Sequence, residues 1–225
     1  MMLKSIYILL FSLIATIGFS QTLSSIDEND PAAKKILDKL KAEYDTYKSM
    51  EVNFELVLEL PQQEAEVQNG FVIQQGDNYK LELDDRAIYS NGEYVWLHIK
   101  KNNEVQINDA EMDEESNMMS PKDMLQLYQS GKFVYAITAE PLLEGKKVTQ
   151  IDFKPLDRDS EFSKMTLFVD KKTKKMTQMK VFSKDGGRYT LKINDITANK
   201  EYALATFAFD VSKFPGIHVE DLRID

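Results

Sequence analysis

The stretch SNGEYVWLHIKKNNEVQI, residues 90–107, decides the fold. Asn91-Gly92 predicts a tight two-residue hairpin turn, because both residue types tolerate positive φ. The strand after the turn divides its side chains between two faces, with Tyr94, Trp96 and His98 on one and Val95, Leu97 and Ile99 on the other. Since both faces are largely apolar, we expect one to lie under a helix and the other inside a barrel or cavity. An ordinary packed core strand would show the same pattern.

Further strands surround this hairpin. From Met50 onward, apolar residues alternate with polar ones, which predicts a half-buried strand ending at Pro61. More strands are predicted at residues 67–75, 78–84, 86–90, 93–100, 103–107, 133–140, 146–155, 162–169, 176–183 and 188–195, with a last alternating segment at 217–224. The connections are too short for crossover helices, so we expect about ten or eleven antiparallel strands.

Two helical segments accompany the strands. Asp30-Pro31 is a capped helix start, and apolar residues recur at helical spacing up to about Lys48. Residues 108–131 interrupt the sheet with an acidic run and a second capped start at Ser120. Four methionines fall in this insertion, namely Met112, Met118, Met119 and Met124. Because Met adapts to irregular apolar sites, they could line a cavity or simply fill the core under a short helix.

The first twenty residues are organised like a secretory signal peptide. Lys4 supplies a positive charge, residues 6–17 are apolar, and small residues Gly18 and Ser20 precede a cleavage site before Gln21. The apolar run is short for a membrane span. We therefore expect residues 1–20 to be removed on export to the periplasm. Residues 21–225 should then form one soluble domain, with no Cys at its start for a lipid anchor.

Charge and composition exclude several classes of function. Without Lys4 the chain has 27 basic residues against 37 acidic ones, a net charge near −10. That charge disfavours nucleic acid as a partner, and it disfavours electrostatic adsorption to anionic lipid surfaces. The absence of cysteine excludes a disulfide framework, a thiol nucleophile and Cys-ligated metals.

No motif specific for catalysis is found. His98 and His218 lack metal-ligand spacing partners, so packed or surface histidines are the better interpretation. There is no Gly-rich phosphate loop, nucleophile elbow, zinc-protease helix or EF-hand, and the acidic run at 109–115 lacks the carboxylate spacing of a calcium loop. We expect a protein that is not an enzyme and needs no cofactor or metal.

The order of features resembles the LolA family of periplasmic lipoprotein carriers. The amphipathic helix at 32–48 precedes Ser49-Met50-Glu51-Val52-Asn53-Phe54, at the family's first strand, followed by Gly70-Phe71-Val72-Ile73 and Tyr79-Lys80-Leu81. The stretch Ser90-Asn91-Gly92-Glu93-Tyr94-Val95-Trp96 matches the family's D/N-G-x-x-L/V-W hairpin. Phe207-Ala208-Phe209 and the stretch from Gly216 to Arg223 match its F-x-F…P-x-G-V-x-V-x-D terminus. The resemblance covers about 200 residues, although no motif is specific alone.

The resemblance implies an unclosed antiparallel half-barrel, covered by the N-terminal helix and a central helical lid. Such a carrier would bind lipoprotein acyl chains in an apolar cavity. It would take them, as a monomer, from an inner-membrane lipoprotein-releasing ABC complex to an acceptor at the outer membrane. One departure is informative. The family often has an Arg-Pro after its second strand that ties the lid shut, whereas this chain has Gln74-Gln75-Gly76-Asp77.

Strand parity and position in the lid suggest which residues contact acyl chains: Phe54, Leu56, Leu58, Val72, Leu81, Leu83, Trp96, Met118, Met119 and Met124. The main alternative to a carrier is a periplasmic sensor or regulatory module that uses the same fold to bind a protein or lipid ligand. An outer-membrane acceptor would normally need a lipidated Cys, which is absent.

Overall fold

The computed structural model describes residues 28–110, 125 and 127–223. The expected signal peptide, Met112, Met118, Met119 and Met124 lie outside these residues. So does most of the expected central lid. Of that segment, the structure describes Leu125, which is buried, and residues 127–131, which include a 3-10 helix, η4 (Leu127–Gln129).

The N-terminal helix α1 (Pro31–Tyr44) begins as predicted and ends four residues early. Asp30 is the N-cap, and its Oδ1 accepts a hydrogen bond from the Ala32 amide at 2.8 Å. At the other end the Thr46 hydroxyl donates to the Glu43 carbonyl at 2.6 Å. The Thr46 amide also donates a hydrogen bond to that carbonyl, at 3.1 Å. Such an i→i−3 bond is typical of the tighter last turn of a helix.

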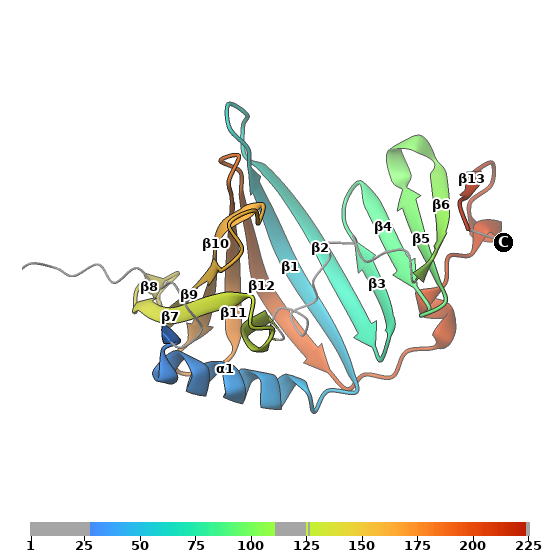
Figure 1. The fold of residues 1–225 in the computed structure, drawn as a ribbon. Coiled ribbons are helices and arrows are strands. Elements are labelled where there is room, and N and C mark those ends of the chain that lie inside the picture. Colours follow the sequence, from blue (N-terminus) through green and yellow to red (C-terminus); the bar gives the residue numbers. More distant parts are fainter. Residues whose placement is uncertain (1–27, 111–124, 126, 224–225) are drawn as a thin grey trace, which may run out of the picture.

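One twisted sheet contains most of the remaining chain. Its strands are β1 (Ser49–Glu59), β2 (Glu66–Gln75), β3 (Asn78–Glu82), β4 (Arg86–Ser90), β5 (Tyr94–Ile99), β6 (Glu104–Asp109), β7 (Phe133–Ala139), β8 (Leu142–Leu143), β9 (Lys146–Pro155), β10 (Phe162–Asp170), β11 (Met176–Ser183), β12 (Arg188–Ala198) and β13 (His218–Asp221). Their order is β13-β6-β5-β4-β3-β2-β1-β12-β11-β10-β9-β7, and β8 pairs with β9 alone. The two edge strands do not pair with each other, so the sheet stays open, as Figure 1 shows.

Three details differ from the sequence prediction. The described chain has thirteen strands, where about ten or eleven were expected, and two of them, β8 and β13, are short. Strand β13 pairs with β6 in parallel, whereas only antiparallel strands were expected. The hairpin turn between β4 and β5 is centred on Gly92 and Glu93, one residue later than predicted. Only Gly92 of this turn has positive φ, and the Asn91 side chain accepts hydrogen bonds from the amides of Glu93 and Tyr94 at 3.0 and 2.8 Å. The turn therefore uses Asn91 as a side-chain cap and places glycine where a II′ turn requires it.

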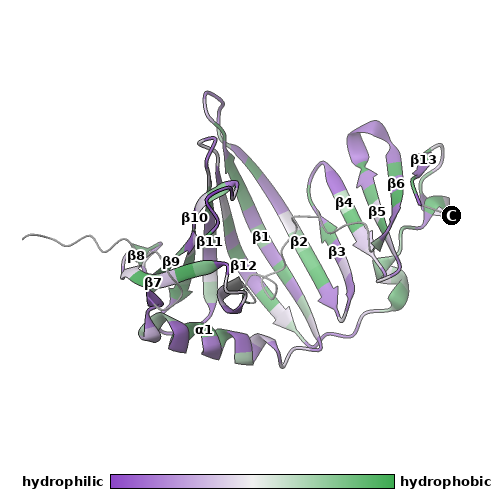
Figure 2. Cartoon of the chain, viewed as in Figure 1, coloured by the Kyte–Doolittle hydropathy of each residue, from purple (hydrophilic) through white to green (hydrophobic). Residues whose placement is uncertain are grey.

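Helix α1 packs against one face of the sheet, which we call the inner face. Its buried residues Leu37, Leu40 and Tyr44 belong to one core cluster with Val52 of β1 and Ile151 of β9. In Figure 1 the helix lies beneath the half of the sheet formed by β7 and β9–β12. Figure 2 shows that apolar and polar residues alternate along β1 and β2, which gives each of these strands one apolar side.

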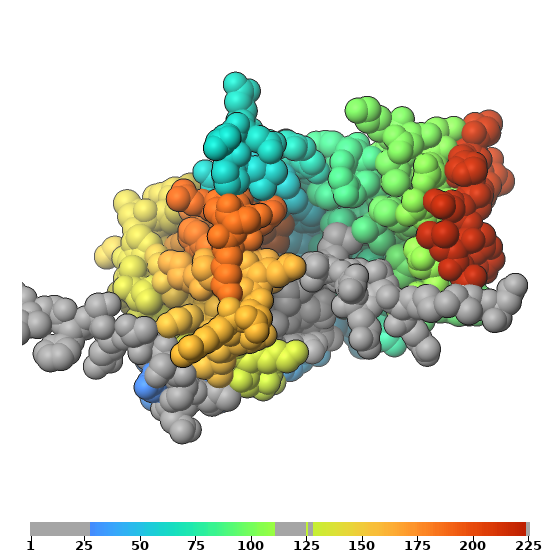
Figure 3. All heavy atoms as spheres, turned by 45° about the horizontal axis from the view of Figure 1, so that its top comes forward, coloured from blue at the N-terminus to red at the C-terminus, as the bar shows by residue number. Residues whose placement is uncertain are grey.

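The opposite, outer face of β3–β6 is covered by the chain that follows β12. This C-terminal segment contains the 3-10 helices η5 (Leu204–Phe207) and η6 (Val211–Lys213) and ends in β13. Phe209 and Phe214 stack with ring centroids 4.7 Å apart, and the ring of His98 lies 5.0 and 4.7 Å from them. His98 is thus a packed histidine, in agreement with the prediction of a packed or surface histidine. The face that it shares with Trp96 is covered by an irregular segment, whereas a helix or a cavity was expected on each face of this strand. Figure 3 shows the C-terminal segment, in red, against β5 and β6, in green.

Candidate functional site

The strand register arranges apolar side chains of the inner face in continuous rows across the sheet. Directly paired residues of antiparallel strands share a face. The first row crosses β5, β4, β3, β2 and β1 through Leu97, Ile88, Leu81, Val72 and Val52. It therefore connects the α1-covered core at Val52 to the part of the sheet far from α1.

A second row crosses the other half of the sheet, from β1 to β9. It passes through Leu56, Leu191, Met179, Leu167 and Ile151. Leu167 and Ile151 are fully buried under the helix, whereas Leu56, Leu191 and Met179 are only half-buried. The apolar surface thus continues beyond the core that α1 covers.

Between the two rows, Phe54 of β1 and Leu83 both approach Gly70 of β2 closely. A Cβ atom placed on Gly70 would lie 2.8 Å from Cζ of Phe54, 2.7 Å from Cδ2 of Leu83 and 2.6 Å from the carbonyl oxygen of Glu82. Only glycine allows the Phe54 ring and Leu83 to approach each other across β2 in this way. Gly70 therefore shapes the middle of the inner face.

Six of the residues predicted to contact acyl chains lie together on this face. Phe54 and Leu81 are buried, with 4% and 5% of their surface exposed, and the other four are half-buried: Leu56, Leu58, Val72 and Leu83. Met118, Met119 and Met124 lie outside the described residues. The structure therefore brings most of the described candidates into one surface.

Trp96 does not belong to that surface. It pairs with Tyr89, and Tyr89 pairs with Lys80, so all three lie on the outer face, opposite to Leu81. The inner-face residues of β4 and β5 are Ile88, Leu97 and Ile99, none of which was predicted as a ligand contact. The alternation within β5 separated Leu97 from Trp96 correctly, but it could not say which of the two faces is the inner one.

Within the part of the chain that the structure describes, two buried side-chain oxygens of the inner face have no hydrogen-bond partner. They are the Oε1 atoms of Gln68, opposite Leu56, and of Gln74, opposite Met50, and both atoms are buried. An unpaired buried amide oxygen costs about 1–3 kcal/mol. These two acceptors could receive N–H donors from a ligand that lies against the inner face.

The described C-terminal part of the expected lid is fastened to α1. The Tyr128 hydroxyl donates to Oδ1 of Asp38 at 2.9 Å, and the Lys34 ammonium donates to both oxygens of the same carboxylate. These two donors, chiefly Lys34, hold the pKa of Asp38 below its usual range, while burial raises the pKa of Tyr128. Tyr128 thus anchors the chain that returns from the insertion.

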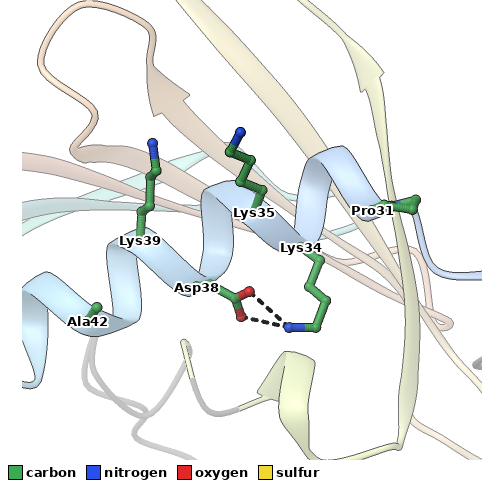
Figure 4. A pocket seen from close by; sticks show the side chains of 6 residues that line it. All are labelled: Pro31, Lys34, Lys35, Asp38, Lys39 and Ala42. Atoms are coloured by element: carbon green, nitrogen blue, oxygen red, sulfur yellow. Dashed lines mark hydrogen bonds and ion pairs between the residues drawn. The ribbon is translucent and has the colours of Figure 1, made fainter.

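The outward side of α1 has a shallow open depression lined by Pro31, Lys34, Lys35, Asp38, Lys39 and Ala42, drawn in Figure 4. These residues lie on helix positions other than those that pack on the sheet, so this depression is separate from the inner face.

Neither metal chemistry nor a membrane helix emerges from the described structure. Within residues 28–110, 125 and 127–223, no three His, Asp or Glu side chains gather as metal ligands would. No helix in that part of the chain has the length and apolar character needed to cross a membrane. The apolar rows of the inner face, with their half-buried side chains, form the candidate binding site.

Comparison with known proteins places this geometry in a family. A family model described as outer membrane lipoprotein carrier protein LolA matches residues 45–210. A comparison with curated proteins gives no match. Among solved structures, an uncharacterized conserved protein from Thermus thermophilus is similar in fold, with 11% identity, a TM-score of 0.53, and coverage of 84% of this chain and 99% of that one.

Two further structures are more distantly similar. A LolA superfamily protein from Nitrosomonas europaea has 14% identity and a TM-score of 0.40 over 80% of this chain and 98% of that one. The Mycobacterium tuberculosis lipoprotein LppX has 10% identity and a TM-score of 0.49 over 78% of this chain and 100% of that one. Because the family model matches well over half of the sequence, the chain belongs to the LolA family of outer membrane lipoprotein carrier proteins.

Proposed function

We propose that this protein is a soluble periplasmic carrier that holds the acyl chains of lipoproteins against its inner face. It would receive its cargo from an inner-membrane lipoprotein-releasing ABC complex and deliver it to an acceptor at the outer membrane. The family membership supports the general role, and the arrangement of the inner face supports the binding site.

The observation that carries the proposal is the set of half-buried apolar side chains on the inner face. Residues in the middle of a thirteen-stranded sheet would normally be fully buried or polar. Here Leu56, Leu58, Val72 and Leu83 are apolar, central and half-buried, which leaves apolar area for a ligand to cover.

The free energy of transferring acyl chains out of water favours their binding to such an apolar surface. Each methylene group removed from water contributes about 0.8 kcal/mol, so lipoprotein acyl chains free in water are strongly unfavourable. Dispersed half-buried side chains on an open sheet can cover such chains without a rigid enclosing wall. This arrangement would allow release as well as binding, which a carrier requires.

The proposed binding and release of cargo do not involve an arginine after β2. Where the family often has Arg-Pro, Gln75 exchanges two hydrogen bonds with the backbone of Tyr202, at 3.3 and 3.2 Å. Gln75 therefore fastens the C-terminal segment instead. We infer that opening and closing in this chain depend on apolar contacts at the inner face.

The test uses two neighbouring residues of β1 that point to opposite faces. Leu56→Glu places a charge on the inner face, and Val57→Glu places the same charge on the outer face, where Val57 pairs with the exposed Val67. Each purified variant is incubated with membranes that contain a triacylated lipoprotein and an ATP-driven release complex, and the soluble lipoprotein is measured.

The proposal expects Leu56→Glu to lose soluble lipoprotein while Val57→Glu retains it, with both variants folded by circular dichroism. Equal retention by both variants would contradict an inner-face site. A wild-type protein that releases no lipoprotein but retains one partner protein would favour the sensor function instead.

A further inference from the structure

Two neighbouring turns concentrate positive charge in a chain that is acidic as a whole. The start of β9, directly after the β8–β9 turn, contributes Lys146 and Lys147, and the β10–β11 turn contributes four more lysines. Together they form what we call the lysine patch: Lys146, Lys147, Lys171, Lys172, Lys174 and Lys175. All six are exposed. The whole chain has a net charge of −9, so the charge of this patch is opposite in sign to the net charge of the protein.

Backbone pairing shows that the two turns are adjacent. Asp170 of β10 pairs with Val148 of β9, and the Lys171 amide donates to the carbonyl oxygen of Lys147 at 2.9 Å. Lys146 and Lys147 in turn pair with Leu143 and Leu142 of β8. The six lysines therefore lie close together at one end of β8–β11.

The acidic residue of the β10–β11 turn, Asp170, is hydrogen-bonded to the backbone of the turn. Asp170 is buried, and its Oδ1 accepts hydrogen bonds from the backbone amides of Lys172 and Thr173 at 2.6 and 2.8 Å. These amides hold the pKa of Asp170 below its usual range. The Asp170 backbone also bonds to Lys174 and Lys175, so the turn is fixed while its lysine side chains extend into solvent.

Few acidic side chains offset the patch. Lys171 forms an ion pair with Glu140 at 2.7 Å, and among the described residues no other lysine of the patch forms one. Residues 139–147 and 170–175 together contain six lysines and three acidic residues, which are Glu140, Glu144 and Asp170. The patch therefore has a net positive charge.

An exposed apolar residue adjoins these charges. Leu142, paired with Lys147, has 68% of its surface exposed. The ammonium groups of lysine act as point charges that bind phosphate groups, which the headgroups of anionic phospholipids carry. Basic side chains beside an exposed apolar one are the composition of surfaces that adsorb to anionic membranes.

We propose that the lysine patch is a docking surface for anionic phospholipid membranes, with Leu142 entering the headgroup region. Net charge alone argues against such adsorption, but screening limits its reach to about 8–10 Å, so the local patch decides the attraction. This contact does not require bound cargo and is separate from the inner face.

The experiment measures cosedimentation with vesicles of phosphatidylcholine alone, or with about 30 mol% phosphatidylglycerol, at low and high salt. It uses the chain from Gln21 onward, which keeps every described residue and removes the apolar N-terminal run. The patch variant has five substitutions to Gln, at Lys146, Lys147, Lys172, Lys174 and Lys175. The control variant has five substitutions to Gln at exposed lysines elsewhere: Lys35, Lys39, Lys48, Lys101 and Lys132.

We expect the wild type to bind the anionic vesicles at low salt and not the neutral ones, with binding weakened by salt. The patch variant should bind at least about tenfold more weakly, and the control variant should stay within about threefold of the wild type. No binding by the wild type, or equal losses in the two variants, would overturn the proposal. So would capture of an acidic protein through the patch by a chain that does not bind vesicles.

Discussion

Gly70→Ala tests the packing at the centre of the inner face. The new Cβ would lie 2.6 Å from the Glu82 carbonyl oxygen, 2.7 Å from Leu83 Cδ2 and 2.8 Å from Phe54 Cζ, all shorter than van der Waals contact distances. The two side chains can shift, but the carbonyl belongs to the backbone of β3. Overpacking of this kind costs about 1–3 kcal/mol. The lower entropy of the unfolded alanine chain offsets about 0.4–1 kcal/mol of that cost.

We therefore expect Gly70→Ala to lower the free energy of unfolding by about 1–2 kcal/mol. With a urea slope of about 2 kcal/mol/M, the midpoint of urea unfolding should fall by about 0.5–1 M. Leu83→Ala and the Gly70→Ala/Leu83→Ala double variant complete a cycle. Removing Leu83 Cδ2 should make the double variant less destabilised than the sum of the single ones. A Gly70→Ala variant as stable as the wild type would refute the close approach of Phe54 and Leu83.

Three further predictions concern contacts that hold the layers together. Asp30→Ala should cost about 1–2 kcal/mol, because Asp30 caps α1 and also accepts the Ile137 amide at 3.0 Å; thermal unfolding checks this, and Asp30→Asn should recover part of the loss. Tyr128→Phe should cost about 1 kcal/mol through the lost hydrogen bond to Asp38, and a cycle with Asp38→Asn would show no coupling if that bond were unimportant. Burial, and then Lys100, lower the pKa of His98. The unfolded chain therefore binds the proton more readily, and stability should decline as pH falls through about 6.5. His98→Phe should weaken this decline between pH 8 and 5.5, and an unchanged urea profile would contradict the assignment.

Much of the sheet follows from alternation and turn residues. The bounds of β4, β9 and β11 agree with those predicted, because turn-forming residues bracket clear apolar runs. Asp30 and Pro31 likewise predicted where α1 starts. These signals are local, so a single sequence is enough to read them.

The remaining features depend on long-range pairing. Alternation placed Trp96 and Leu97 on different faces. Which of the two faces is the inner one depends on the register of β5 through β4, β3 and β2 to β1, so the inner face could not be assigned from the sequence. The parallel pairing of β13 with β6 and the packing of Phe209 and Phe214 on His98 join segments about a hundred residues apart. No short-range pattern predicts such contacts.

The net charge of the whole chain does not reveal the lysine patch. A value of −9 describes the average surface, whereas the lysine patch arises because two turns distant in sequence become neighbours. Only the pairing of β9 with β10 reveals that concentration of charge.

The central claim is that the inner face holds acyl chains, and native mass spectrometry of the protein isolated from its own cells tests it most directly. The wild type and Val57→Glu should carry masses of triacylated lipoprotein or acyl chains, and Leu56→Glu should be free of them. An empty wild type, or a Leu56→Glu variant that carries the same lipid, would contradict the account.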